Sequence, residues 1–302
     1  MTEIADSEVA SPSGAFRKMW EVHKFGGTSV ASAECYLKVA AIVEEQLECG
    51  LDDDNIDQKH LAVVVSAMGG KPKTTDMLLS SVRAAANRDE DGVSSLLDQI
   101  LTKHSVCLDE LDCLDSDVSE LLKGRIMSDL SDIRDILKTV SLMKWQAARI
   151  SELVSGYGEL WSAQILSALL EARSKSRMTN NPGCQHHRFV YLDARRVITI
   201  DEEAIENGAV VWQLSDSKLA KVYEEERAKY EDGSLHFIVT GYVASNTEGV
   251  ATTLQRDGSD YSAAIMGRLL QAKSISIWTD VDGVLSADPR RVPHAHVIGE
   301  VR

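Results

Sequence analysis

One lysine stands two residues before a glycine pair in the stretch Val22–Val30, VHKFGGTSV. Gly26 and Gly27 allow positive φ and close approach of another atom to the main chain, while hydroxyls such as that of Ser29 can cap a helix. Apolar residues at helical spacing follow, so a phosphate could bind at the helix start, where free N–H groups and the helix dipole favour an anion. The alternative is a tight strand-to-helix connection with Lys24 solvated, and this stretch alone favours neither interpretation.

A second candidate anion site is the run RDGSD, at the expected start of another helix. Arg256 can pair with a carboxylate through two hydrogen bonds, and the free N–H groups of the helix start can bind an anion. An ordinary capping segment would explain Ser259 and Asp260 but not Arg256.

Three further segments place polar residues where strands or loops end. In WTDVDGVLSADPRR, Thr279 and Asp280 end a strand and Arg290 lies near the close of the segment, although an ordinary β-turn is the alternative. Thr75 after SAMGGKPK and Glu159 after GYG stand at two expected loop-to-helix entries, where each could be a simple cap.

Alternating strand and helix signals indicate the elements that must position these residues. Leu61–Met68 is a β-branched apolar run, typical of a parallel strand buried on both faces, and it opens into a glycine loop. Mostly helix is expected from 75 to 170, and Gly156–Ala172 is interpreted as a glycine turn entering an amphipathic helix.

The rest of the chain continues this alternation. Arg188–Ile200 predicts strand, turn and strand, and a polar helix is expected near Ser217–Tyr230. Strand, helix and strand then follow in HFIVTGYVAS, DYSAAIMGRLLQA and SISIWTDVDGV. A βα repeat with both sheet faces covered predicts an α/β fold, a three-layer α/β/α sandwich with a mainly parallel sheet.

Composition narrows the function classes. The chain has 302 residues, 44% of them hydrophobic, and a net charge of -15, which argues against nucleic acid as the main partner because such binding needs a basic face. A nucleotide remains compatible, since a few cationic side chains and Mg²⁺ can hold a triphosphate in an acidic protein. No apolar run is long enough to span a membrane. The five cysteines form no C-x-x-C pair, which favours a reducing compartment.

No metal site is predicted from the histidines. His186–His187 and His294 with His296 lack a third ligand nearby, so they are expected to be surface loop residues. Familiar kinase motifs are also missing: there is no G-x-x-x-x-G-K-[ST] loop and no H-R-D with D-F-G. A phosphate enzyme built from this sequence would therefore use another scaffold.

Six motifs, in order along the chain, carry a family resemblance: KFGGTS, VSAMGG, GYGE, VTGYVAS, TTLQRDGSDYSAA and WTDVDGVLSADPR. Together they resemble the aspartate kinase branch of the amino acid kinase family, and their residues are most similar to those of the kinase domain of bifunctional aspartokinase–homoserine dehydrogenases. The resemblance implies the amino acid kinase fold and phosphorylation of the β-carboxylate of L-aspartate by ATP and Mg²⁺, the first step toward lysine, threonine and methionine. A carboxylate acceptor is already ionised at neutral pH, so charge neutralisation and positioning are the main catalytic requirements.

The resemblance also implies a role for each motif residue. Lys24 would bridge the transferring phosphoryl group, and Asp260 would organise Lys24 or the substrate ammonium. The other positions divide between the phosphate turn (Gly26, Gly27, Ser29), the aspartate pocket (Thr75, Glu159, Arg256, Ser259) and the ATP segment (Thr279, Asp280, Arg290).

The same resemblance divides the chain. Residues 1–20 are expected to be a disordered tail and 21–302 a catalytic domain, with its nucleotide-binding part at about 235–302. The chain ends at Arg302, so it is expected to lack ACT domains and their feedback regulation. Related kinases usually place a tyrosine where this chain has Leu285, which would raise the KM for ATP.

Two alternatives to an aspartate kinase stay open. One is another amino acid kinase, although RDGSDYSAA together with GYGE argues against it. The other is a catalytically incomplete fragment that binds nucleotide or a partner subunit. A homo-oligomer is compatible with the sequence, and the expected compartment is the cytoplasm, or the plastid if a transit peptide has been removed.

Overall fold

A computed structural model describes residues 20–48, 59–143, 148–181, 186–201, 209–229, 234–254, 258–279, 283, 285–288 and 291–299. The centre of the molecule is a sheet of five parallel strands. In spatial order these are β3 (His187–Leu192), β6 (Ser234–Thr240), β2 (His60–Val65), β1 (Trp20–Phe25) and β9 (Ser274–Trp278). The first strand begins one residue before the expected domain boundary, and Trp20 is fully buried.

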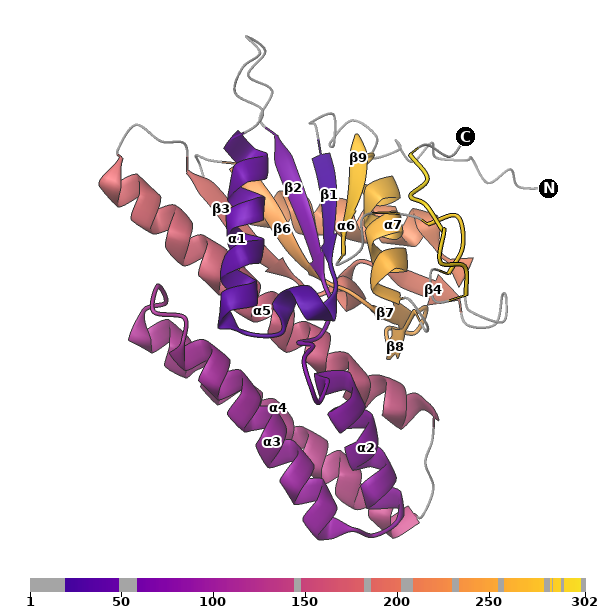
Figure 1. Cartoon of the computed structure of the whole chain (residues 1–302). Coiled ribbons are helices and arrows are strands. Elements are labelled where there is room, and N and C mark those ends of the chain that lie inside the picture. Colours follow the sequence, from indigo (N-terminus) through magenta and orange to yellow (C-terminus); the bar gives the residue numbers. More distant parts are fainter. Residues whose placement is uncertain are drawn as a thin grey trace, which may run out of the picture.

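Helices cover both faces of this sheet (Figure 1). On one face lie α1 (Ala33–Glu48) and the long α5 (Ala148–Asn180), and on the other α6 (Trp212–Arg227) and α7 (Gly258–Leu269). Successive side chains of β2 point to opposite faces, so Val63 joins the α1–α5 core whereas Val64 joins the α6–α7 core. The α/β/α sandwich with a parallel sheet is therefore confirmed.

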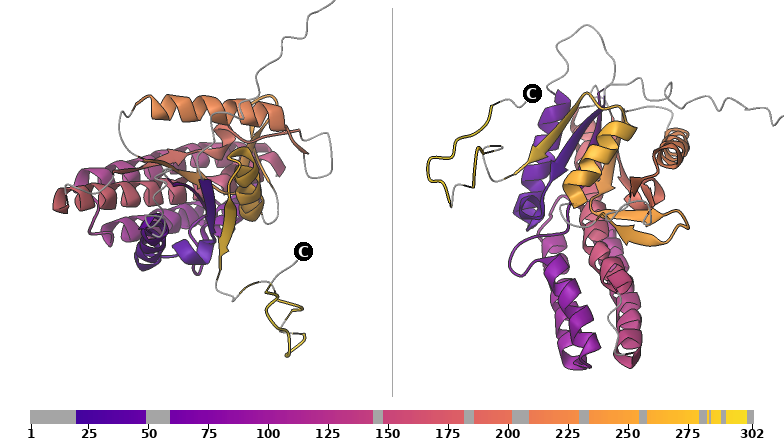
Figure 2. Two further views of the ribbon diagram at one scale, coloured as in Figure 1. Left: turned by 90° about the horizontal axis from the view of Figure 1, so that it is seen from above. Right: turned by 90° about the vertical axis from the view of Figure 1, so that its right-hand side faces the viewer.

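Three helices form an extension beyond the sheet, together with the start of α5 (Figures 1 and 2). They are α2 (Thr74–Ala86), α3 (Glu90–Asp109) and α4 (Ser116–Met143). Their apolar faces belong to the same core cluster as α1 and α5, so the extension is continuous with the body of the domain. The mostly helical region expected from 75 to 170 is confirmed by α2–α5.

A second sheet of four short strands was not anticipated. It consists of β5 (Ala209–Val210), β4 (Thr199–Asp201), β7 (Val243–Asn246) and β8 (Ala251–Thr253). Two short 3₁₀ helices complete the described elements, η2 (Gly27–Val30) after β1 and η3 (Ala194–Arg196) before β4.

Three expectations about local structure were wrong in detail. The GYG stretch lies inside α5 instead of forming a turn before it. A Cβ on Gly158 would stand 2.7 Å from Cβ of Ala67, so this glycine allows a helix and a loop to pack closely. The polar helix α6 begins at Trp212, five residues before the expected Ser217. His187 begins β3 and its Nδ1 lies 3.0 Å from Nε2 of His236, because pairing of β3 with β6 brings the two rings together.

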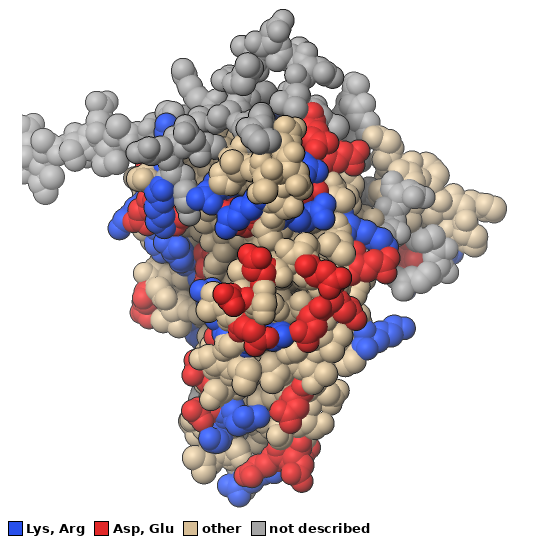
Figure 3. Space-filling view, turned by 90° about the vertical axis from the view of Figure 1, so that its left-hand side faces the viewer, with Lys and Arg blue, Asp and Glu red and all other residues tan. Residues whose placement is uncertain are grey.

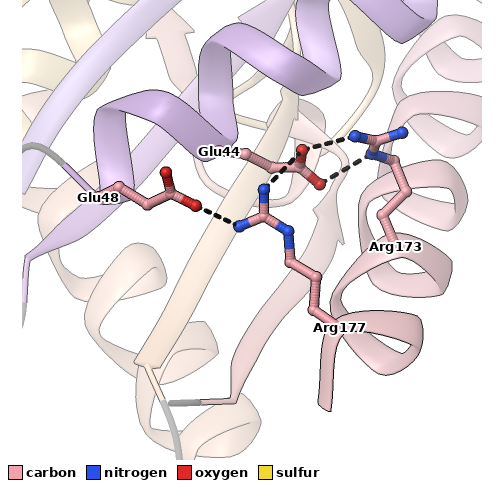
Figure 4. Close-up of polar contacts among 4 residues, drawn as sticks. All are labelled: Glu44, Glu48, Arg173 and Arg177. Atoms are coloured by element: carbon pink, nitrogen blue, oxygen red, sulfur yellow. Dashed lines mark hydrogen bonds and ion pairs between the residues drawn. The ribbon is translucent and has the colours of Figure 1, made fainter. Parts of the chain in front are cut away.

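An ion-pair network joins α1 to the C-terminal part of α5 (Figure 4). Glu44 is only 8% exposed and accepts two hydrogen bonds from Arg173, of 2.7 and 2.8 Å, and one from Arg177 at 3.2 Å. Arg177 also donates to Glu48 at 2.7 Å, but Glu48 is 62% exposed. The two carboxylates therefore differ in their access to water and in the number of guanidinium groups that they bind.

This difference gives a prediction about stability. Glu44→Gln should lower the free energy of unfolding by about 1–3 kcal/mol, because the guanidinium groups of Arg173 and Arg177 lose their buried, charged acceptor. Glu48→Gln, the matched control, should cost less than about 1 kcal/mol, since water solvates the exposed pair. Urea unfolding followed by circular dichroism measures both. Equal losses would show that neither burial nor the second guanidinium partner of Glu44 sets the strength of this network.

The surface shown in Figure 3 carries Lys and Arg side chains interspersed with Asp and Glu side chains. Among the helices that the structure describes, none is both long and apolar enough to cross a membrane.

Candidate functional site

A cleft of about 770 Å³ opens where the carboxyl ends of β1, β2 and β6 meet the first turns of α2 and α7. Loops after parallel strands of a sheet meet at one edge, which is where such folds bind ligands. Seven of the residues predicted from the sequence line this cleft: Lys24, Gly26, Gly27, Thr75, Glu159, Ser259 and Asp260.

Lys24 lies on β1 and carries the cationic group of the cleft nearest the glycine turn. Its Nζ is 2.6 Å from Oδ1 of Asp260 in the first turn of α7, and its side chain is 12% exposed. A Cβ built on Gly26 would stand 3.7 Å from the same nitrogen. The ammonium is therefore held between the carboxylate and the glycine turn, within reach of an anion in the cleft.

The glycine loops after β1 and β2 touch each other through their backbones. The N–H of Gly69 donates to the carbonyl of Gly27 at 2.9 Å, and a Cβ on Gly69 would stand 2.3 Å from that oxygen. A Cβ on Gly27 would be 2.8 Å from the carbonyl of Ala67. Any larger side chain would push the loops apart, so both glycines are required by this contact. The turn leads into η2 before α1 begins, and Ser29 lies in this short helix outside the cleft lining.

The cleft lining also contains a buried carboxyl group. Glu159 on α5 is 4% exposed, and burial raises its pKa to about 8 even though the backbone N–H of Ala67 hydrogen-bonds to it. Its Oε2 has no hydrogen-bond partner among the described residues. A buried acceptor without a partner fits an incoming cation such as a substrate ammonium.

Helix starts supply the remaining predicted residues of the cleft. Thr75 is the second residue of α2, as expected of a loop-to-helix entry, and Ser259 is the second residue of α7. A Cβ on Gly241 would meet Oγ of Ser259 at 2.5 Å, so this glycine lets the loop after β6 approach α7.

Among the lining residues that were not predicted as site residues from the sequence are Tyr242, Lys73 and Asp76. Tyr242 has a positive φ of 67°, and its backbone N–H donates to Oγ of Ser262 at 2.9 Å. Its ring packs over Gly258, where a Cβ would approach within 2.7 Å of Cδ2. The signal for Tyr242 was its place after Gly241 in VTGYVAS, and the other two residues lie within or just beyond SAMGGKPKTT.

The predicted nucleotide segment is only partly described. Arg256, Asp280 and Arg290 lie outside the described residues. Thr279 follows β9, is exposed and does not line the cleft. Leu285 is half-buried and forms an isolated antiparallel bridge with Val297.

Comparison with known proteins shows the family to which the chain belongs. The sequence profile described as the Amino acid kinase family matches residues 19–302. The chain belongs to this family. The cleft at the carboxyl ends of β1, β2 and β6 is thus part of an amino acid kinase fold.

Individual relatives are aspartokinases. The chain is 36% identical over 291 residues to the bifunctional aspartokinase/homoserine dehydrogenase, chloroplastic, of Daucus carota. The matched region covers 96% of this chain and 28% of that protein. It is 25% identical to E. coli aspartokinase III in complex with lysine and aspartate, with a TM-score of 0.69 over 93% of this chain and 54% of that one. A second structure of that enzyme, with aspartate and ADP, is 24% identical with a TM-score of 0.71, over 92% of this chain and 53% of that one. The chain therefore spans little more than a quarter of the carrot relative.

Proposed function

We propose that this amino acid kinase family member is an aspartate kinase core, which transfers the γ-phosphoryl group of ATP to the β-carboxylate of L-aspartate. The products would be ADP and 4-phospho-L-aspartate, the first step toward lysine, threonine and methionine. The observation that carries the proposal is the pairing, within one cleft, of the Lys24–Asp260 ion pair with the buried, unpaired carboxyl of Glu159. The carrot and E. coli relatives, both named aspartokinases, support the choice of substrate.

The chemistry requires two anions to meet. The acceptor carboxylate of aspartate is ionised at neutral pH and needs no strong base, but its approach to the γ-phosphate is opposed by charge repulsion. The ammonium of Lys24 neutralises charge on the transferring group, and Asp260 holds that ammonium at the glycine turn. The carboxylate oxygen forms the new P–O bond as the bond to the β-phosphate oxygen breaks, and no proton transfer is needed.

The acceptor is proposed to lie between α5 and α2. Glu159 would accept a hydrogen bond from the aspartate ammonium, because its Oε2 lacks a partner in the described structure. Thr75 and Ser259 supply hydroxyls from two helix starts that line the same cavity. Arg256 is assigned to the α-carboxylate by the family resemblance.

Residues 21–302 are proposed as the catalytic domain, with the nucleotide held mainly by 235–302 through Thr279, Asp280 and Arg290. The described residues contain no group of three or more His, Cys, Asp or Glu side chains that could hold a metal ion. Mg²⁺ is proposed to bind with the nucleotide phosphates and few protein ligands, which is the usual way this ion binds in kinases. The E. coli structure with aspartate and ADP supports a nucleotide in this fold.

The compartment is proposed as the cytoplasm, or as the plastid if a transit peptide has been removed. The carrot relative, which is named chloroplastic, supports the second. A homo-oligomer of soluble chains, without nucleic acid or membrane partners, completes the proposal.

Trapping of the acyl phosphate by hydroxylamine tests the proposed function. With Mg-ATP, the protein should form the aspartyl hydroxamate with L-aspartate but not with L-glutamate or without acceptor, since the acyl phosphate exists only after transfer to the right carboxylate. Equal signal with glutamate would point to another member of the family. Binding of ATP without any hydroxamate would support the catalytically incomplete fragment instead.

A further inference from the structure

The loop after β2, residues 66–73, separates two hollows. Ser66, Gly69 and Lys73 line the cleft with Lys24, whereas Gly70 and Pro72 line a second cavity of about 790 Å³ on the side of α3. The loop is therefore a thin partition with space on both sides. Ala67, Met68 and Gly69 are buried by packing, whereas residues 70–73 are exposed, so polar contacts must help to hold the second half of the loop.

On the cleft side, the loop is held by the backbone bond from Gly69 to Gly27. The loop is also connected to the residues proposed to bind the amino acid. The N–H of Ala67 hydrogen-bonds to the carboxyl of Glu159, and the loop leads directly into α2, where Thr75 lies. A shift of this loop would thus disturb the two residues proposed to hold the amino acid. Lys24 on β1 would be less affected.

On the other side, one lysine of α3 holds the loop. Nζ of Lys103 hydrogen-bonds to the carbonyl of Gly69 and, at 2.8 Å, to the carbonyl of Pro72. The side chain is half-buried, and this burial lowers its pKa. Hydrogen bonds from a charged donor are stronger than neutral ones, so this ammonium is the main polar restraint of the loop on the α3 side.

We propose that Lys103 is a positioning residue for the amino-acid side of the cleft: it holds the Gly69 and Pro72 carbonyls and so keeps the loop against Gly27, Glu159 and the start of α2. Because the carbonyls of both Gly69 and Pro72 are held, the peptide planes between these two residues are restrained. Without the ammonium, both carbonyls lose their donor and the loop has free volume into which it can withdraw. The kinetic part of this inference rests on the proposed function, whereas the structural part does not.

Lys103→Met tests the inference, because it keeps most of the aliphatic stem and removes the donor. The KM for aspartate should rise roughly tenfold, as expected when a substrate-binding group is misplaced by a fraction of an ångström, whereas the KM for Mg-ATP and kcat should change less than about threefold. Lys103→Arg should recover part of the loss, since guanidinium can donate to both carbonyls. Lys138→Met is the matched control, because Lys138 is an exposed lysine of α4 that pairs with Asp135.

A second measurement is independent of catalysis. In hydrogen exchange followed by mass spectrometry, peptides covering residues 66–74 should lose protection in Lys103→Met, while peptides of β1 and α5 keep theirs. Unchanged exchange of this loop would overturn the proposal whether or not the protein phosphorylates aspartate. Faster exchange with equal rises in both KM values would overturn the assignment to the amino-acid side. Absence of activity in the unsubstituted protein would refute the proposed function and leave the exchange result to decide the role of Lys103.

Discussion

Lys24→Ala should lower kcat for aspartate phosphorylation by about 10²–10³-fold, the usual cost of removing one charged group that stabilises a transition state. In the cleft, Nζ of Lys24 is 2.6 Å from Asp260 and stands over the glycine turn. Lys73 is the other lysine among the residues that line the cleft, but it lies on the loop after β2, whereas Lys24 is the one paired with Asp260 beside the glycine turn. Initial rates at saturating aspartate and Mg-ATP measure the effect.

The fold should survive this substitution. Oδ1 of Asp260 is buried against the ammonium, but the side chain as a whole is 44% exposed and lines the cleft, so water can enter the space that Lys24→Ala leaves. The loss of stability should be about 1–3 kcal/mol, between the usual cost of breaking an exposed ion pair and that of breaking a buried one. Lys38→Ala controls for loss of a lysine as such, because Lys38 is an exposed residue of α1 paired with Glu34.

Asp260→Asn distinguishes the role of the Asp260 carboxylate from that of the Lys24 ammonium. It keeps the shape of the side chain but removes the charge that holds the ammonium, so we expect a smaller loss of kcat than for Lys24→Ala. If Lys24→Ala retained more than about a tenth of the activity, Lys24 would not bridge the transferring group. A larger loss for Asp260→Asn would place the main electrostatic role on the carboxylate.

Local sequence patterns predicted the elements that dominate the central sheet. The β-branched run of β2 and the helical periodicity of α1 each depend on residues that are near in the sequence, and both elements formed as expected. Lys24 was chosen as a candidate because its strand, a glycine pair and a helix lie close together in the sequence. Such signals survive because local preference and tertiary packing agree.

The features that were missed depend on contacts between distant segments. The GYG stretch reads as a turn from glycine content alone, but Gly158 serves to pack α5 against Ala67. The second sheet pairs very short strands, such as β4 with β7 through Thr199 and Ser245, and neither has a periodic pattern long enough to detect. Lys103 looks like any lysine on a helix until α3 packs against the loop after β2.

Glu159→Gln should have opposite effects on substrate binding and on stability. The buried carboxyl has a pKa of about 8, against 4.5 in the unfolded chain. The unfolded state therefore loses its proton first, and the stability that the neutral carboxyl provides below pH 4.5 is lost as the pH rises through 8. Glutamine carries no proton to lose, so the variant should be more stable than the parent near pH 8, by about 1.4 kcal/mol for each pKa unit of the shift at most. Urea unfolding at pH 5 and pH 8 measures the difference.

Binding of the amino acid should change in the other direction. An aspartate ammonium next to Oε2 favours the ionised carboxylate, so binding near neutral pH should release a proton and the KM for aspartate should fall as the pH approaches 8. Glu159→Gln should raise that KM by about 10–100-fold, the cost of losing a hydrogen bond between two charged groups, and should remove its pH dependence. Calorimetry of aspartate binding in two buffers of different ionisation enthalpy detects the proton directly.

The neighbouring Glu152 provides the matched control, since it lies on the same helix and accepts a hydrogen bond from Thr252 at 3.2 Å, outside the cleft lining. Glu152→Gln should leave the KM for aspartate within about twofold of the parent value. If Glu159→Gln gained stability at pH 8 without weakening aspartate binding, the carboxyl would be a buried structural group and the ammonium would bind elsewhere. If it lost both, burial would not be what keeps Glu159 protonated. Only a gain in stability combined with weaker binding fits a carboxyl that is kept uncharged until the substrate supplies its partner.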